Sequence, residues 1–168
     1  DYVGGFAGYT TDYNYYNTSI RQCGNTGNIN ADSYCGGIVG TAYAYDTISM
    51  CYNIGNLSSS ASCGGICYNS SNNISYSYNS GNISISSSNF GFGVSEWEDK
   101  NCYNAGSITT NGGSAYGVAN NCTGNNYYLN TTGTYGCGSP RTEANMKSVS
   151  FPTMLNTDSA VYGMDELG

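Results

Sequence analysis

Residues 51–57 read Cys51-Tyr-Asn-Ile-Gly-Asn-Leu57, and close copies of this seven-residue block recur along the chain. The other copies begin at Cys23, Ser77 and Cys102, so successive blocks start 28, 26 and 25 residues apart. A repeated block at such a period is typical of folds in which each unit stacks on the next. The sequence therefore predicts a repeat protein.

A second block, rich in glycine and apolar residues, alternates with the first. Its clearest copies are Cys35-Gly-Gly-Ile-Val-Gly40 and Cys63-Gly-Gly-Ile-Cys67, and shorter relatives occupy 4–8, 90–94 and 115–119. Short apolar runs separated by Gly, Asn and Ser favour β-strands joined by turns. Because so short a unit cannot bury an apolar face alone, equivalent strands of stacked units should pair in parallel, about 4.8 Å apart.

We therefore expect an all-β fold, a parallel β-helix or β-solenoid of about five coils. The handedness of parallel crossovers favours a right-handed coil. Residues 1–140 should form the coils, residues 141–156 a short helical C-terminal cap, and residues 157–168 a tail or linker remnant of the same single domain. Thr142 is suited to be the N-cap of a helix over 143–148. Such a cap would cover strand edges that otherwise invite aggregation.

Stacking should place equivalent side chains in ladders that run along the solenoid. Neighbouring residues of a strand face opposite sides, so the Cys and Tyr ladders should point in opposite directions. The expected ladders are Cys23, Cys51, Ser77 and Cys102; Ile29, Leu57, Ile83 and Ile108; Tyr52, Tyr78 and Tyr103; and Asn25, Asn53, Asn79 and Asn104.

The charge of the chain argues against several classes of partner. The net charge is −7, only 9% of residues are charged, and there is no His. The four cations, Arg21, Lys100, Arg141 and Lys147, are too few and too scattered to bind nucleic acid or an anionic membrane. No apolar run approaches the roughly 20 residues of a membrane span. The first residues already look like repeat sequence, so we expect a piece of a longer protein.

The blocks together resemble the GLUG-type repeat of bacterial surface and secreted proteins. The resemblance is carried by residues 36–40, 51–57 and 102–108, and by the tail from Arg141 to Asn156, which is similar to the end of such an array. It implies a β-helical surface module, often an accessory to adhesins or large proteases. It implies an extracellular or cell-surface location in a bacterium, and no catalytic residues.

The eight cysteines allow three interpretations. Cys63 and Cys67 are spaced for zinc, but no His and no second close pair completes four ligands. Disulfides suit an extracellular protein, and the 28-residue offset favours Cys23–Cys51 and Cys35–Cys63 as pairs on adjacent coils. The third interpretation is a core ladder of free thiols, since Cys packs as a small hydrophobe.

The segment Glu96-Trp97-Glu98-Asp99-Lys100 holds the only Trp and the only acidic cluster. Glu96, Glu98 and Asp99 are a weak Ca²⁺ candidate, because their spacing does not match that of a Ca²⁺-binding loop. Trp97 is a candidate for stacking on a sugar. Alternatively the segment is a solvated insertion whose Trp covers the core.

Nothing in the chain indicates a catalytic site or a cofactor. Asp12, Asp32 and Asp46 do not recur in register, and the absence of His rules out a Ser/His/Asp triad. We therefore expect a non-catalytic structural or adhesive module that presents Tyr, Asn and Ser ladders to a glycan, a surface protein or like subunits. The ligand-binding candidates are Trp97, Tyr52, Tyr78 and Tyr103. The alternatives are a filament or sheath subunit assembled head to tail, and a polysaccharide-processing β-helix enzyme.

Overall fold

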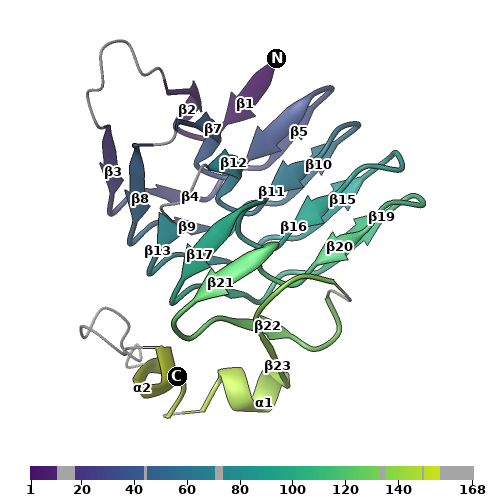
Figure 1. The fold of residues 1–168 in the computed structure, drawn as a ribbon. Helices are drawn as coiled ribbons and strands as arrows, with labels where there is room; N and C mark the ends of the chain where they lie inside the picture. Colours follow the sequence, from purple (N-terminus) through teal and green to yellow (C-terminus); the bar gives the residue numbers. More distant parts are fainter. Residues whose placement is uncertain (11–17, 44, 71–73, 133–134, 149, 156–168) are drawn as a thin grey trace.

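The computed structural model describes residues 1–10, 18–43, 45–70, 74–132, 135–148 and 150–155. These residues form a β-solenoid of about four coils, in which equivalent strands of successive coils lie side by side (Figure 1). The strands pair in parallel from coil to coil. The predicted fold class is therefore confirmed. The tail at 157–168 lies outside the described residues.

A full coil visits five parallel sheets, named here A to E in the order in which the chain reaches them. Sheet A holds β1 (Tyr2–Gly4), β6 (Tyr34–Gly36), β11 (Cys63–Gly64), β16 (Gly91–Phe92) and β20 (Ala115–Tyr116). Sheet B holds β2 (Ala7–Tyr9), β7 (Val39–Ala42) and β12 (Cys67–Ser70). Sheet C holds β3 (Ser19–Arg21), β8 (Thr47–Ser49), β13 (Ile74–Ser75), β17 (Glu98–Lys100) and β21 (Asn121–Thr123).

The last two sheets carry the seven-residue blocks. Sheet D holds β4 (Gly24–Asn25), β9 (Tyr52–Asn53), β14 (Tyr78–Asn79), β18 (Tyr103–Asn104), β22 (Tyr127–Leu129) and β23 (Ser139–Arg141). Sheet E holds β5 (Ile29–Ala31), β10 (Leu57–Ser59), β15 (Ile83–Ile85) and β19 (Ile108–Thr110). The ladders expected from the repeat are confirmed, since Leu57 pairs with both Ile29 and Ile83, and Tyr78 pairs with both Tyr52 and Tyr103.

The number of coils is smaller than the five expected. After β19 the chain adds β20, β21 and β22, but the described residues contain no further strand of sheet E. Tyr127 pairs with Tyr103, so the block of the fifth coil begins at Asn126, and it lacks the Asn-x-Gly corner that leads each earlier coil from sheet D into sheet E. The fifth coil is therefore incomplete.

The interior of the solenoid is lined by small aliphatic side chains and thiols. One buried cluster lies inside sheets B and C and includes Ile48, Ile74 and Cys51, and another lies inside sheets A and E and includes Leu57 and Ile83. In β3 the alternation is simple, since Ile20 is buried between exposed Ser19 and Arg21. The stacked units thus bury the continuous apolar face that a single unit cannot bury.

The Asn ladder is a buried chain of side-chain hydrogen bonds. The Nδ2 group of Asn53 donates to Oδ1 of Asn79 at 2.7 Å and to the carbonyl of Gly55 at 2.8 Å. Asn25 donates to Asn53, and Asn79 donates to Asn104, each at 2.8 Å. Because Asn53, Asn79 and Asn104 are fully buried, these bonds replace those that water would make.

In the second, third and fourth coils the glycine of the Asn-x-Gly corner (Gly55, Gly81 and Gly106) is required by close approach to the preceding coil. A Cβ atom at Gly81 would lie 2.0 Å from the carbonyl oxygen of Gly55, and one at Gly106 would lie 2.0 Å from that of Gly81. No side chain fits between backbones at that separation. The corner glycines therefore permit the coils to stack at strand spacing.

Asp99 interrupts a buried row of isoleucines in sheet C. It pairs in register with Ile74, which in turn pairs with Ile48, and its side chain is fully buried. One carboxyl oxygen accepts from the Ser95 hydroxyl at 2.8 Å, and the other has no hydrogen-bond partner. Burial raises the pKa of Asp99 well above its ordinary value.

Two short helices follow the last coil, α1 (Glu143–Met146) and α2 (Phe151–Leu155). Thr142 is the N-cap of α1, as predicted, and its hydroxyl accepts from the amide of Asn145. Phe151 and Leu155 pack with Tyr127 on β22, next to Tyr103 on β18, in a small buried cluster. Within the described ranges, no helix is long and apolar enough to cross a membrane.

The first prediction concerns the Asn ladder. We expect Asn79→Asp to destabilise the fold by about 2–4 kcal/mol near neutral pH, because a carboxylate would face the Asn104 and Gly81 oxygens that now accept from Asn79. At about pH 4 part of the loss should be recovered as the new carboxyl group takes up a proton. Urea unfolding at both pH values measures this, with Asn30→Ala on the exposed side of β5 as the control. Equal midpoints for wild type and Asn79→Asp would contradict a structural role for the ladder.

The second prediction concerns Asp99. Because its pKa is raised in the folded state, the folded protein holds this proton more tightly than the unfolded chain does. The resulting stabilisation should be complete below about pH 4 and should be lost as the pH rises toward the folded-state pKa. Asp99→Asn keeps an oxygen for Ser95 but cannot ionise, so its stability relative to wild type should rise with pH. If the free energies of unfolding of the two proteins change in parallel between about pH 4 and pH 8, the pKa of Asp99 in the folded state is ordinary and the prediction is wrong.

Candidate functional site

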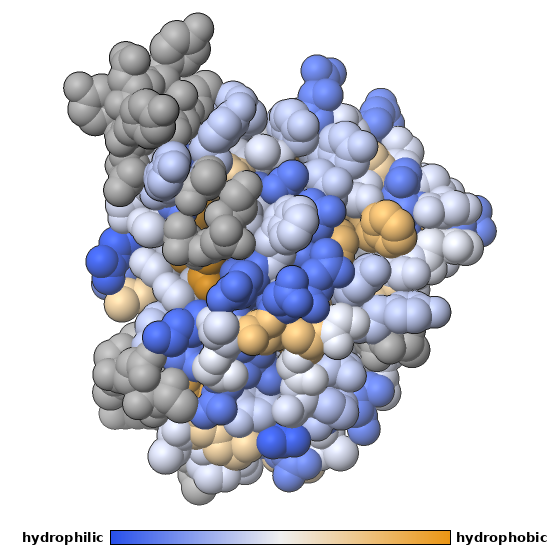
Figure 2. Space-filling model, viewed as in Figure 1, coloured by the Kyte–Doolittle hydropathy of each residue, from blue (hydrophilic) through white to orange (hydrophobic). Residues whose placement is uncertain are grey.

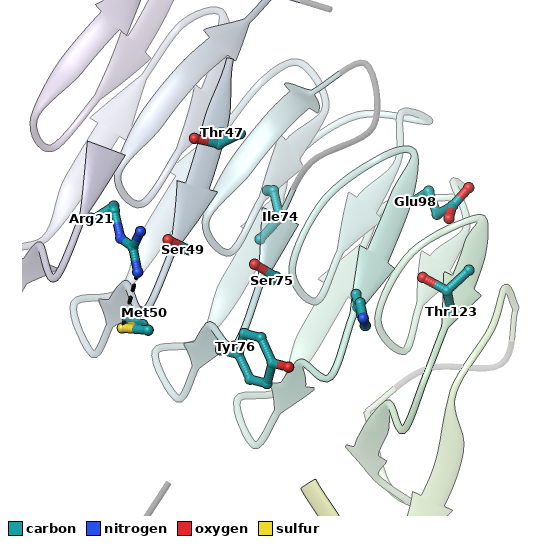
Figure 3. A pocket seen from close by; sticks show the side chains of 10 residues that line it. Arg21, Thr47, Ser49, Met50, Ile74, Ser75, Tyr76, Glu98 and Thr123 are labelled. Carbon is teal, nitrogen blue, oxygen red and sulfur yellow. Dashed lines mark hydrogen bonds between the residues drawn. The ribbon is translucent and has the colours of Figure 1, made fainter. Parts of the chain in front are cut away.

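The outer face of sheet C carries a polar hollow of about 570 Å³, called here the axial groove because it runs from coil to coil (Figure 3). Its lining residues come from all five strands of the sheet and from the corners that follow them; they are Arg21, Thr47, Ser49, Met50, Ile74, Ser75, Tyr76, Glu98, Lys100 and Thr123. In the view of Figure 2 the surface is mostly hydrophilic, with small separated apolar areas.

The floor of the groove is a row of outward-facing side chains in strict register. Strand pairing places equivalent positions of adjacent coils beside one another, in the order Arg21, Ser49, Ser75, Lys100 and Thr123. The preceding outward position carries Thr47 on β8 and Glu98 on β17. The row therefore presents hydroxyl groups with a cation at two of its five positions.

One rim of the groove is formed by the corner that joins sheet C to sheet D. The residue at this corner has positive φ in each coil, at 53° for Gln22, 55° for Met50, 49° for Tyr76 and 53° for Asn101. A left-handed conformation is uncommon for residues other than Gly, and Met50 and Tyr76 line the groove from it. The guanidinium of Arg21 lies 3.9 Å from the Met50 sulfur, which holds it along this rim (Figure 3).

The four basic residues divide between the groove and the C-terminal cap. Arg21 and Lys100 line the groove. Lys147 forms an exposed ion pair with Glu143 at 2.6 Å, and the Arg141 guanidinium lies 4.7 Å above the ring of Tyr127. Glu98 is the one carboxylate among the residues that line the groove.

The Tyr ladder proposed from the sequence as a ligand surface is a stack of rings. The centroids of Tyr52 and Tyr78 lie 5.6 Å apart, and those of Tyr78 and Tyr103 lie 4.9 Å apart with nearly parallel planes. Phe151 packs against Tyr103 at one end, and Tyr52 lies against Gly24 at the other, where a Cβ atom would meet its ring at 2.1 Å. Because these neighbours cover the ring faces, the ladder offers edges and hydroxyls to solvent.

The acidic segment around Trp97 does not gather its carboxylates. Asp99 points into the core, Glu98 lines the groove, and burial raises the pKa of Glu96, whose backbone amide donates to the carbonyl of Tyr68. Among the described residues no three His, Cys, Asp or Glu side chains could hold a metal ion together. The Trp97 side chain is 45% exposed.

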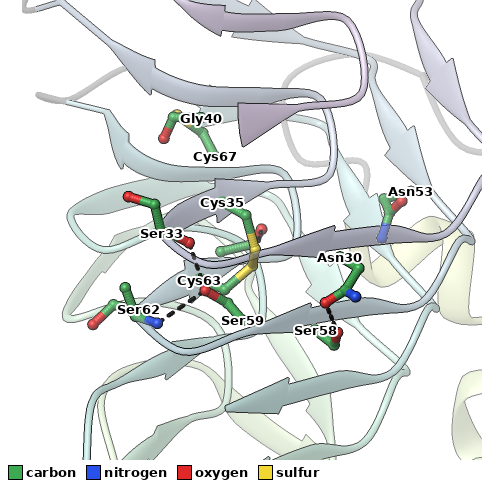
Figure 4. The surroundings of a disulfide bond; sticks show 12 residues. Asn30, Ser33, Cys35, Gly40, Asn53, Ser58, Ser59, Ser62, Cys63 and Cys67 are labelled. Atoms are coloured by element: carbon green, nitrogen blue, oxygen red, sulfur yellow. Dashed lines mark hydrogen bonds between the residues drawn. A yellow bond between two sulfur atoms is a disulfide. The ribbon is translucent and has the colours of Figure 1, made fainter. Parts of the chain in front are cut away.

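The cysteines of the repeat follow two patterns. Cys35 and Cys63, one of the two expected pairs, form a disulfide between β6 and β11 (Figure 4). The other expected pair is not formed. The thiols of Cys23 and Cys51 donate instead to the carbonyls two residues upstream, each at 3.3 Å. A further disulfide, Cys122–Cys137, joins β21 to the segment just before β23 and was not predicted.

The remaining thiols are buried in the core rather than placed for chemistry. Burial raises the pKa values of Cys51, Cys67 and Cys102, which keeps them protonated. Cys63 is disulfide-bonded, so it cannot join Cys67 in a zinc site. The structure thus combines the disulfide and free-thiol interpretations, one in each ladder.

A second aromatic stack, which sequence reasoning missed, runs along sheets A and B. Neighbouring ring centroids lie 4.6–6.4 Å apart in the order Tyr9, Tyr2, Tyr34, Tyr68, Phe92, Tyr116 and Tyr135. Burial and, to a smaller extent, the nearby Glu96 carboxylate together raise the pKa of Tyr68 to about 12. The signal in the sequence is weak, because these aromatics occupy different positions of the Gly-rich block in different coils.

Comparison with known proteins bears on the repeat alone. No curated protein and no solved structure matches the chain. One family model matches, described as the GLUG motif, over residues 1–30, which hold β1 to β4 and the start of β5. The resemblance to the GLUG repeat is thereby confirmed, and residues 1–30 are similar to that motif.

Proposed function

We propose that this chain is a non-catalytic binding module of a secreted or cell-surface protein, and that its axial groove holds an extended glycan. The observation that carries the proposal is the floor of the groove, where one outward side chain per coil recurs in register over five strands. These positions repeat about every 4.8 Å. A surface that repeats along one axis suits a ligand that repeats along one axis.

The chemistry of the lining supports a sugar ligand. Ser49, Ser75 and Thr123 offer hydroxyls that both donate and accept, as sugar hydroxyls require. Tyr76 and Met50 add aromatic and apolar contact along the rim. The volume of about 570 Å³ lies within the range of small-molecule sites.

The distribution of acidic groups supports a non-catalytic role. Glycoside hydrolysis generally requires two carboxyl groups about 5–9.5 Å apart on either side of the bond that is cleaved. The residues that line the groove include one carboxylate, Glu98. The buried Asp99 is turned away from the groove, into the core. These positions favour binding over bond cleavage.

An extracellular setting is supported by the disulfides. Cys35–Cys63 and Cys122–Cys137 are both bonded, and such bonds persist in oxidising compartments.

The third prediction tests the groove directly. Ser75→Trp places a large ring in the middle of the groove floor and should reduce binding to glycan polymers by about tenfold or more. Ser84→Trp, on the exposed side of β15 in sheet E, is the matched control and should bind like wild type. Affinity electrophoresis through gels that contain neutral or acidic glycans measures both, with circular dichroism to check folding. Wild-type protein that binds none of the polymers, or equal losses in the two variants, would refute the proposal.

A further inference from the structure

Two cations stand in the floor of the groove at a defined separation. Arg21 on β3 and Lys100 on β17 occupy equivalent outward positions, three strand steps apart through Ser49 and Ser75. Three steps of ~4.8 Å place them about 14 Å apart along the solenoid axis. Both side chains are exposed on the groove face.

The rest of the described surface does not offer anions a comparable site. The chain carries a net charge of −7. Its other two cations, Arg141 on β23 and Lys147 at the end of α1, lie outside the groove. An anionic polymer would therefore be repelled over most of the surface and attracted along this groove, which restricts where it binds.

From this arrangement we infer that the ligand of the axial groove is an anionic polysaccharide, one whose sugars carry carboxylate or sulfate groups. The inference rests on the proposed function and adds the chemical class of the ligand. Acidic groups of the polymer pair with Arg21 in the first coil and Lys100 in the fourth. The hydroxyls of Ser49 and Ser75 bond to the sugars between them.

Glu98 provides a second test of the inference, because its carboxylate repels an anionic ligand in the groove. It lies two residues from Lys100 on the same strand, and both side chains line the groove. A carboxylate at this point repels an acidic sugar that is out of register with the two cations. Its removal should therefore strengthen the binding of an anionic polymer and leave the binding of a neutral one unchanged.

The fourth prediction uses single charge changes on the intact chain. The probes are polygalacturonate, dextran sulfate and neutral dextran, and binding is measured by titration calorimetry at low and high salt. Wild type should bind at least one of the two acidic polymers, more weakly at high salt because the contacts are exposed to solvent. Arg21→Gln and Lys100→Gln should each weaken this binding about two- to fivefold, and Glu98→Gln should strengthen it by a similar factor. Lys147→Gln, a cation on the cap, is the matched control and should have no effect.

The outcomes separate the inference from the proposed function. If neutral dextran binds as tightly as the acidic polymers and Ser75→Trp abolishes it, the groove binds glycans but the anionic class is wrong. If no polymer binds, both proposals fall. If Lys147→Gln weakens binding as much as Arg21→Gln, the attraction is non-specific and the inference is overturned. A gain of affinity in Glu98→Gln supports the anionic class of the ligand, because a variant that failed to fold would lose affinity and not gain it.

Discussion

Parallel pairing in strict register places every residue of this solenoid beside its own counterpart, about 4.8 Å away, in the coils before and after. A residue type can therefore recur only if it tolerates contact with a copy of itself. Ile packs on Ile, Tyr stacks on Tyr, and the Asn amide carries both a donor and an acceptor, so identical copies bond in a chain from Asn25 to Asn104. Like charges at this spacing repel, which accounts for the low charged fraction of 9%.

The charged residues that do occur stand where the repeat is broken. Arg21 and Lys100 are separated by two serines, so neither faces a copy of itself. Glu98 and Asp99 belong to one segment of the fourth coil, in which an acidic residue replaces the isoleucine of the second and third coils. The repeated residues are thus similar from coil to coil, while Glu98 and Lys100 of the fourth coil place charges near one end of the groove.

Most of the fold could be predicted from the repeat, because equivalent positions in successive copies define the register of the strands. The ladders through Leu57 and Tyr78 and the Cys35–Cys63 pair all follow from position within a block, and the Thr142 cap follows from local helix-capping chemistry. The groove was not predicted, since its floor comes from the strand upstream of each block, where only the isoleucines recur. The Cys122–Cys137 bond joins two positions that are not equivalent in the repeat, so no offset between copies could indicate it. Periodicity also could not show that the Tyr rings cover one another's faces.

The features that the repeat could not predict have a common physical origin, and this origin matters for ligand binding. A repeated residue contacts its own copies in the adjacent coils, so its polar groups or ring faces are largely occupied within the stack. The hydrogen bonds of the Asn ladder and the stacked rings of the Tyr ladder are examples. An outward residue that differs from its counterparts in the adjacent coils does not stack on a copy of itself. Arg21, Glu98 and Lys100 are such residues, and they share one face. The regular rows supply a rigid platform with a fixed step, and the departures from regularity supply the charge that would select a ligand and set its register on the platform.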